Sequence, residues 1–92
     1  MPFAAVVTVK IEGDPAVGQK ALEEVLVPRV KALPGFQRAR FMRTLDGTTG
    51  VGAVTFDTEA NAKTGLETLT TNRPPEAPAV QNTALYEVFL EV

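Results

Sequence analysis

The sequence predicts an α+β fold in which a four-stranded antiparallel sheet carries two helices on one face. The segments Phe3–Ile11 and Gly50–Phe56 are apolar on both of their alternating faces, as expected of central strands that are covered above and below. The predicted elements follow the order strand, helix, strand, strand, helix, strand. Right-handed crossovers place the first and third strands of this order, which are these two segments, at the centre of the sheet. Pattern and topology therefore agree on one ferredoxin-like domain over residues 1–92.

A helix is expected after the first strand. Asp14 is its predicted N-cap, and Pro15 lies in the first turn, where its missing N–H costs nothing. Apolar residues then recur at helical spacing: Val17, Ala21, Leu22, Val25 and Leu26. Pro28 removes a helical hydrogen bond, so we expect a kink there or a second start that leads to Val30 and Leu33. Pro34-Gly35 is the predicted end of the helix.

The second strand, predicted over Phe36–Thr44, has the pattern of an edge strand. It alternates between Ala39 and Phe41 on one face and Arg38, Arg40 and Met42 on the other. Charged side chains in line are typical of sheet edges, where they discourage pairing with another chain. The Asp46-Gly47 pair then predicts a hairpin turn that leads into the strand Gly50–Phe56.

The second helix should begin at an Asp57 or Thr58 cap and present a narrow apolar stripe to the sheet, formed by Ala62, Gly65, Leu66 and Leu69. Gly65 costs about 1 kcal/mol of helix propensity relative to alanine, which indicates a close approach to the sheet. The composition of residues 70–82 predicts a loop, and its bare PxxP pattern (Pro75, Pro78) indicates a stiff surface connection. The last strand is predicted over Thr83–Val92.

Composition excludes several classes of function. The chain has no cysteine and no histidine, so it lacks the usual ligands of zinc, haem and iron–sulfur centres and the usual neutral-pH general base; we expect no metal and no cofactor. Its net charge of -2 does not favour nucleic acid or an anionic membrane as a partner. No apolar run approaches membrane-spanning length, so a cytoplasmic protein is the expectation.

Two helices can cover only one face of this sheet. The other face should carry Val6, Thr8, Val51, Ala53 and Thr55. A few hundred Å² of such surface is unusual on a monomer. At about 25 cal/mol per Å², burying it against a second copy of the chain would contribute many kcal/mol before the costs of association. A homodimer formed through the sheet face is therefore predicted.

The chain resembles the dimeric α/β-barrel superfamily, and within it the antibiotic-biosynthesis-monooxygenase-like group. The resemblance lies in Leu33-Pro34-Gly35-Phe36, the Asp46-Gly47 hairpin, the segment 54–60 (Val-Thr-Phe-Asp-Thr-Glu-Ala) and the closing segment 86–92 (Tyr-Glu-Val-Phe-Leu-Glu-Val). It implies a homodimer whose two sheets pack face to face, with a pocket in each subunit between sheet and helices. It also implies relatives that include cofactor-free monooxygenases of aromatic polyketides and haem-degrading enzymes.

The sequence departs from the catalytic pattern of these enzymes. Haem degraders of this group bind iron through a histidine, and both enzyme types use tryptophan and an asparagine in a strand or pocket. This chain has neither histidine nor tryptophan. Its asparagines (Asn61, Asn72 and Asn82) fall at a predicted helix start and in predicted loops. No catalytic residue can therefore be assigned from the resemblance, and haem degradation is disfavoured.

Five residues are candidates for contacting a ligand, each with a simpler alternative. Arg38 and Arg40 offer paired donors to an anionic or phenolate group, although edge protection and pairing with glutamates at a dimer seam are the favoured explanation. Tyr86 is a candidate proton donor or a packed ring, and Thr8 and Thr55 are small polar contacts or ordinary strand formers.

Two functions follow from these observations, and a third is disfavoured. The first is a cofactor-independent monooxygenase-like enzyme that acts on a small aromatic metabolite. The second is a non-catalytic dimeric module that binds a small hydrophobic molecule. RNA binding, suggested by the spacing within 50–56, is disfavoured because Val51 and Ala53 stand where that motif needs exposed aromatic rings.

Overall fold

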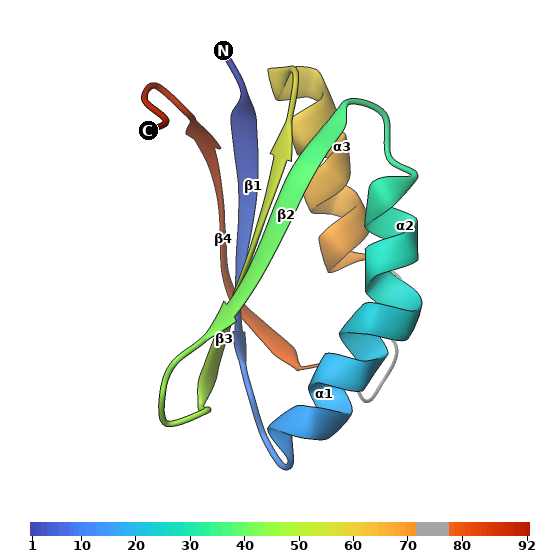
Figure 1. Cartoon of the computed structure of the whole chain (residues 1–92), viewed down its shortest axis with the longest axis vertical. Helices are drawn as coiled ribbons and strands as arrows, with labels where there is room; N and C mark the ends of the chain where they lie inside the picture. Colours follow the sequence, from blue (N-terminus) through green and yellow to red (C-terminus); the bar gives the residue numbers. More distant parts are fainter. Residues whose placement is uncertain (72–77) are drawn as a thin grey trace.

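The computed structural model describes residues 1–71 and 78–92 of the chain. Its strands and helices follow the predicted order (Figure 1). They are β1 (Phe3–Lys10), α1 (Pro15–Ala21), the π-helical segment η1 (Leu22–Leu26), α2 (Val27–Lys31), β2 (Phe36–Arg43), β3 (Thr49–Phe56), α3 (Glu59–Thr70) and β4 (Ala79–Glu87). The second proline of the PxxP pattern, Pro78, is among the described residues, whereas Pro75 lies outside them.

The four strands form one antiparallel sheet in the order β2-β3-β1-β4, which confirms the predicted ferredoxin-like topology. The two strands predicted to be central, β1 and β3, pair with each other, and β2 is an edge strand as expected. Figure 1 shows the helix of α1, η1 and α2, together with α3, on the same side of the sheet. The opposite side, which we call the open face, carries no helix in the described part of the chain.

The hydrophobic core lies between α3 and the centre of the sheet. Phe56, Val54 and Ala5 of the sheet are fully buried, and Ala62 and Leu69 of α3 pack against them. Gly65 allows this packing, because a Cβ atom at that position would overlap the ring of Phe56. The predicted stripe of α3 and the close approach at Gly65 are therefore confirmed. Thr58 is the N-cap: its hydroxyl accepts a hydrogen bond from the Asn61 N–H at 3.1 Å.

The first helix continues through Pro28 without a break: η1 leads directly into α2, and Leu26 and Val27 keep αR backbone angles, so the second start that the sequence left open is not observed. Asp14 caps its N-terminus by accepting from the Ala16 N–H at 2.9 Å. Proline has no N–H to donate to the preceding turn, and the residues before it form the π-helical segment, in which the Val27 N–H donates to the Leu22 carbonyl. The predicted apolar stripe is only partly buried: the side chains of Val17 and Val25 are 68% and 53% exposed.

The last strand differs from the prediction at both ends, because it covers Ala79–Glu87 rather than Thr83–Val92. The alternating pattern continues beyond Glu87, but the chain leaves the sheet there. The Val88 N–H donates to the Pro2 carbonyl at 2.9 Å, and the Glu91 carboxylate pairs with the Arg38 guanidinium at 3.1 Å. Since β4 and β2 are opposite edges of the sheet, this ion pair requires the final residues to cross the open face.

Asp46 organises the hairpin between β2 and β3. Its carboxylate accepts hydrogen bonds from the Thr44 hydroxyl at 2.6 Å, the Thr48 hydroxyl at 2.8 Å and the Thr48 N–H at 3.1 Å. These bonds, led by the one from Thr44, lower the pKa of the Asp46 carboxyl below its usual value of 3.8. Gly47 follows with a φ of 76°, which explains the Asp-Gly sequence at this turn.

Replacing Gly65 tests the close packing of α3. Gly65→Ala should destabilise the fold by about 1–3 kcal/mol, because the new Cβ meets a ring that is fully buried and the overlap outweighs the gain in helix propensity. Gly18→Ala is the matched control: it changes a helical glycine with open space around its Cβ position and should stabilise by about 0.5–1 kcal/mol. Denaturant unfolding measures both. Equal effects of the two substitutions would contradict the packing argument.

The Asp46 hydrogen bonds should make the hairpin sensitive to acid. The folded-state pKa lies below the unfolded value, so the carboxylate contributes stability above the unfolded pKa and loses it as the pH falls through the folded pKa. Asp46→Asn should therefore destabilise the protein at neutral pH. The difference in the free energy of unfolding between this variant and the wild type should shrink as the pH falls towards about 2. Unfolding measured across this range, with NMR titration of the carboxyl, tests this. A pKa above 3.8 would contradict it.

Candidate functional site

A cleft opens between α2 and β2, where the first helix diverges from the sheet. It has a volume of about 380 Å³. Its lining residues come from the last helical turns and the edge strand: Val27, Val30, Lys31, Phe36, Arg38, Ala39 and Phe41. We call this space the α2–β2 cleft. It lies on the helix side of the sheet, where the resemblance places the pocket.

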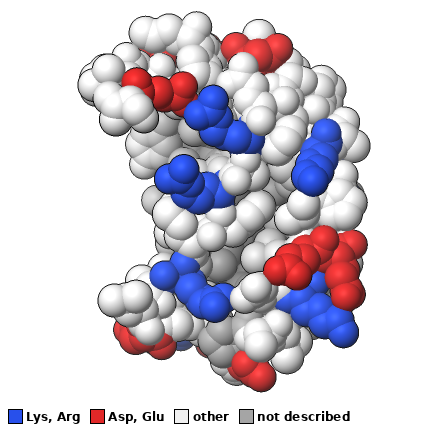
Figure 2. All heavy atoms as spheres, viewed as in Figure 1, with Lys and Arg blue, Asp and Glu red and all other residues white. Residues whose placement is uncertain are grey.

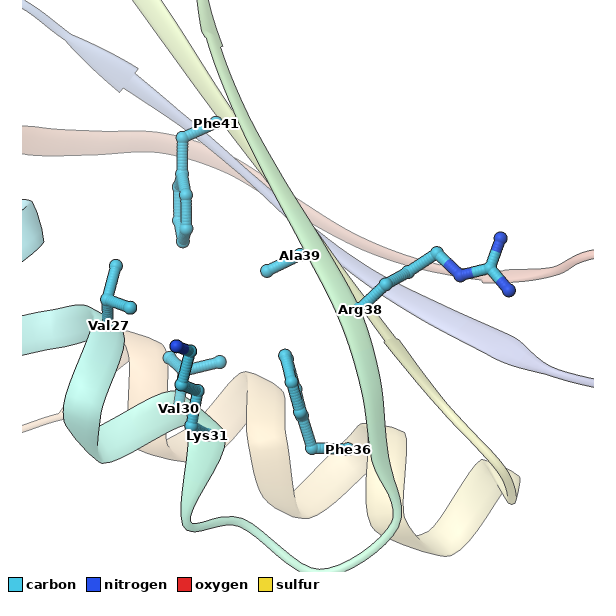
Figure 3. A pocket seen from close by; sticks show the side chains of 7 residues that line it. All are labelled: Val27, Val30, Lys31, Phe36, Arg38, Ala39 and Phe41. Atoms are coloured by element: carbon cyan, nitrogen blue, oxygen red, sulfur yellow. The ribbon is translucent and has the colours of Figure 1, made fainter.

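The walls of the α2–β2 cleft are mainly apolar and include two aromatic rings. Figure 3 shows Phe36, Ala39 and Phe41 extending from β2 towards α2, and Val27 and Val30 extending from α2 towards them. Phe41 also covers the backbone of Gly52 on the neighbouring strand, which leaves room for its ring. A cleft with this volume and lining suits a small, flat, apolar molecule.

The side chains of the two charged residues that line the cleft, Lys31 and Arg38, point in different directions. In Figure 3 the Lys31 side chain rises from α2 beside Val30, whereas the Arg38 side chain leaves β2 on the opposite side of the strand. The guanidinium of Arg38 pairs with Glu91 over the open face. Further along β2, Arg43 donates to the Gln19 side-chain oxygen at 3.2 Å and so connects β2 to α1. Lys31 is therefore the cationic side chain that the cleft itself presents.

The five predicted ligand residues lie on the open face, and of these only Arg38 also lines the cleft. Residues that pair directly across antiparallel strands point to the same face, so the register sorts the open face into rows. From β2 to β4 these rows are Arg38, Thr55, Ala4 and Tyr86; then Arg40, Ala53, Val6 and Ala84; then Met42, Val51, Thr8 and Asn82.

The first row brings three of the candidates into one line. Thr55 and Ala4 are only 8% and 9% exposed, although no described helix covers them, and the Arg38–Glu91 ion pair lies at this end of the open face. Tyr86 is 55% exposed at the other edge. Thr8 belongs to the third row, away from the other candidates. The five residues therefore form part of a broad surface, and their role in binding a ligand stays a prediction.

Arg40 lies in the middle row of the open face, opposite Ala53. Figure 2 shows basic side chains in a column over the region of β2, which contributes Arg38, Arg40 and Arg43. Arg38 has Glu91 as its partner, but Arg40 forms no ion pair within residues 1–71 and 78–92. The centre of the open face thus combines small apolar groups with one arginine that has no carboxylate partner in the described chain.

Three further observations concern metal ligands, the asparagines and membrane-spanning helices. In the described ranges, no group of three or more acidic, histidine or cysteine side chains is placed to hold a metal ion. Asn61 lies at the start of α3, as predicted, and donates to the Asp57 carboxylate at 2.8 Å. The prediction for Asn82 was wrong, because it lies in β4 and not in a loop, and Asn72 is outside the described residues. Nor is any described helix long and apolar enough to cross a membrane.

The resemblance implied a pocket between the sheet and the helices, but sequence reasoning did not identify the residues that line the α2–β2 cleft. The alternation of β2 correctly placed Ala39 and Phe41 on the face away from the arginines. The distance that separates α2 from β2, however, depends on how the first helix packs as a whole. Lys31 carried no signal of its own, since a lysine near the end of a helix is common.

Several monooxygenase-like proteins whose structures have been solved have the same fold as this chain. SnoaB from Streptomyces nogalater, a cofactor-independent oxygenase solved in a mutant form, superimposes with a TM-score of 0.75 at 14% identity, covering 99% of this chain and 96% of SnoaB. The ActVA-Orf6 monooxygenase of Streptomyces coelicolor, solved with nanaomycin D, superimposes with a TM-score of 0.65 at 20% identity. This match covers 98% of this chain and 89% of the monooxygenase chain. The heme-degrading protein Rv3592 of Mycobacterium tuberculosis superimposes with a TM-score of 0.62 at 18% identity. This match covers 100% of this chain and 99% of the Rv3592 chain.

These comparisons establish the fold. The chain has the ferredoxin-like fold of the antibiotic-biosynthesis-monooxygenase-like proteins over nearly its whole length, as the sequence resemblance implied. No protein-family model matches the sequence, and no curated protein matches it. At identities of 11–20% the structural likeness leaves reaction, ligand and assembly to be argued from this chain's own residues.

Proposed function

We propose that this protein binds a small aromatic metabolite in the α2–β2 cleft and oxygenates it without a cofactor. The observation that carries the proposal is the cleft itself, an apolar space of about 380 Å³ with Phe36 and Phe41 on one wall. Aromatic side chains in the wall of a cavity bind aromatic rings through stacking and through the burial of apolar surface. SnoaB and ActVA-Orf6, which share this fold, support oxygenation as the reaction.

The chemistry requires little from the protein if the substrate is an electron-rich phenol or its enolic equivalent. Such a substrate supplies both electrons and both hydrogens: one oxygen atom of dioxygen enters the ring, and the other leaves as water. The cleft then has to orient the ring and exclude bulk water from the reacting carbon. Its valine and phenylalanine side chains are suited to both tasks.

The second candidate function is binding without catalysis. It is favoured by one observation: apart from Lys31, the side chains directed into the α2–β2 cleft carry no acid, base or nucleophile. A protein of this kind would hold a small hydrophobic molecule for release or presentation elsewhere. The two functions share the same site and differ in whether dioxygen is consumed.

Oxygen uptake separates the two candidates. With a panel of naphthols and anthrones, the wild type should consume dioxygen above the uncatalysed rate and yield the oxidised ring and water. Ala39→Phe should fill the cleft and lower the rate about tenfold or more, because the ring can no longer be seated correctly. Ala60→Phe, an equal change at an exposed site on α3, is the control. If the protein binds these aromatic compounds but consumes no dioxygen, the result would support the second function. If it binds none of them, the result would contradict both functions.

The protein is also proposed to act as a homodimer through its open face. The middle row of this face offers small groups, Ala53, Val6 and Ala84, and half-buried apolar neighbours that a second sheet would cover. Two copies related by a two-fold axis would place this surface against itself. The cleft lies on the other side of the sheet, so pairing would leave it accessible.

A charge placed in the centre of the open face should separate the two chains. Ala53→Lys puts an ammonium beside Arg40 and opposite its own copy in the dimer, where burial of like charges is unfavourable. Sedimentation equilibrium should show a two-chain mass for the wild type and a one-chain mass for this variant. Ala32→Lys, an exposed change next to α2, is the control. A wild type that sediments as one chain at micromolar concentration would contradict the dimer.

A further inference from the structure

The geometry points to Lys31 as a specificity-determining residue: we infer that its ammonium group binds an acidic group on the aromatic ligand, so that the α2–β2 cleft selects anions over neutral molecules of the same shape. The inference rests on the proposed function, because it needs a ligand in the cleft. It adds the charge of that ligand and names a residue that none of the sequence patterns singled out.

Lys31 lies where an acidic substituent of a seated ring would emerge. It follows Val30, which is fully buried beneath the cleft, and it lines the cleft together with Val27. Facing these residues across the cleft are Phe36 and Phe41 of β2. A flat molecule held between these aliphatic and aromatic walls would therefore have its edge, where substituents are attached, beside the Lys31 side chain.

The charge around Lys31 also favours an anion. Lys31, like Lys20, Arg29, Arg40 and Arg43, forms no ion pair within the described ranges, so no carboxylate of the described chain competes with a ligand for its ammonium group. The residues that line the cleft include no aspartate or glutamate, so an anionic ligand would meet no repulsion from the walls. A lysine with a free ammonium at the rim of an apolar cleft can bind a carboxylate, sulfonate or phenolate by a charge-assisted hydrogen bond.

A structural role for Lys31 makes a different prediction. The residue lies in the last turn of α2, where a cation interacts favourably with the helix dipole. In that role its charge would affect stability but would have no influence on the choice between charged and neutral ligands. The test must therefore measure ligand preference as well as affinity.

Two fluorescent probes with the same rings provide this measurement. The first is 8-anilinonaphthalene-1-sulfonate, and the second is N-phenyl-1-naphthylamine, which lacks the sulfonate. Lys31→Met should weaken binding of the sulfonate about three- to tenfold and leave the neutral probe nearly unchanged. Lys31→Arg should restore the preference for the sulfonate. Added salt should weaken the wild type's binding of the sulfonate and not that of the neutral probe.

Control variants separate this inference from the proposed function. Lys20→Met removes an exposed charge from α1, outside the cleft, and should leave both affinities unchanged. Ala39→Phe should abolish binding of both probes. If Lys31→Met affects both probes equally, or affects neither, the inference is overturned while the cleft remains a binding site. If the wild type binds neither probe in a manner sensitive to Ala39→Phe, the binding site fails and the inference fails with it.

Discussion

The contact between Gly65 and Phe56 determines how the layers of this protein are arranged. Because Gly65 has no side chain, α3 lies directly on the buried ring and close to β1, β3 and β4. The first helix has no equivalent contact, and its backbone lies farther from the strands. One side of the helical layer is therefore closely packed, and the other side leaves the α2–β2 cleft beside the edge strand. The cleft arises from this difference between two helices on one sheet.

Those features that depend on local chemistry could be predicted from the sequence. The alternation of apolar residues identified β1 and β3 as central strands, and the caps at Asp14 and Thr58 were correct because each depends on side chains within three residues. The prediction for the last strand was wrong because an alternating pattern does not stop at Glu87. The strand ends through contacts of Val88 with Pro2 and of Glu91 with Arg38, and residues so distant in sequence leave no local signal.

The candidate site was less predictable than the fold for a related reason. The face of each β2 residue follows from its position in the strand, so Ala39 and Phe41 were placed together correctly. Which face holds the cleft depends on the packing of the first helix, in which Pro28 and the π-helical segment before it change the hydrogen-bonding pattern. Arginine and tyrosine drew attention because of their chemistry, yet Arg38, Arg40 and Tyr86 lie on the open face.

The two faces of the sheet therefore suit two different tasks. The open face is broad, with small side chains at its centre, and it resembles a surface for another sheet more than a site for a small molecule. The cleft face is narrow and aromatic, and it presents one ammonium group. Reactivity in such a cleft has to come largely from the ligand, because the walls offer no pair of groups for acid–base catalysis. A phenolate bound in the cleft is already deprotonated at the reacting ring and needs no separate base, whereas a carboxylate or sulfonate substituent would only position the ring.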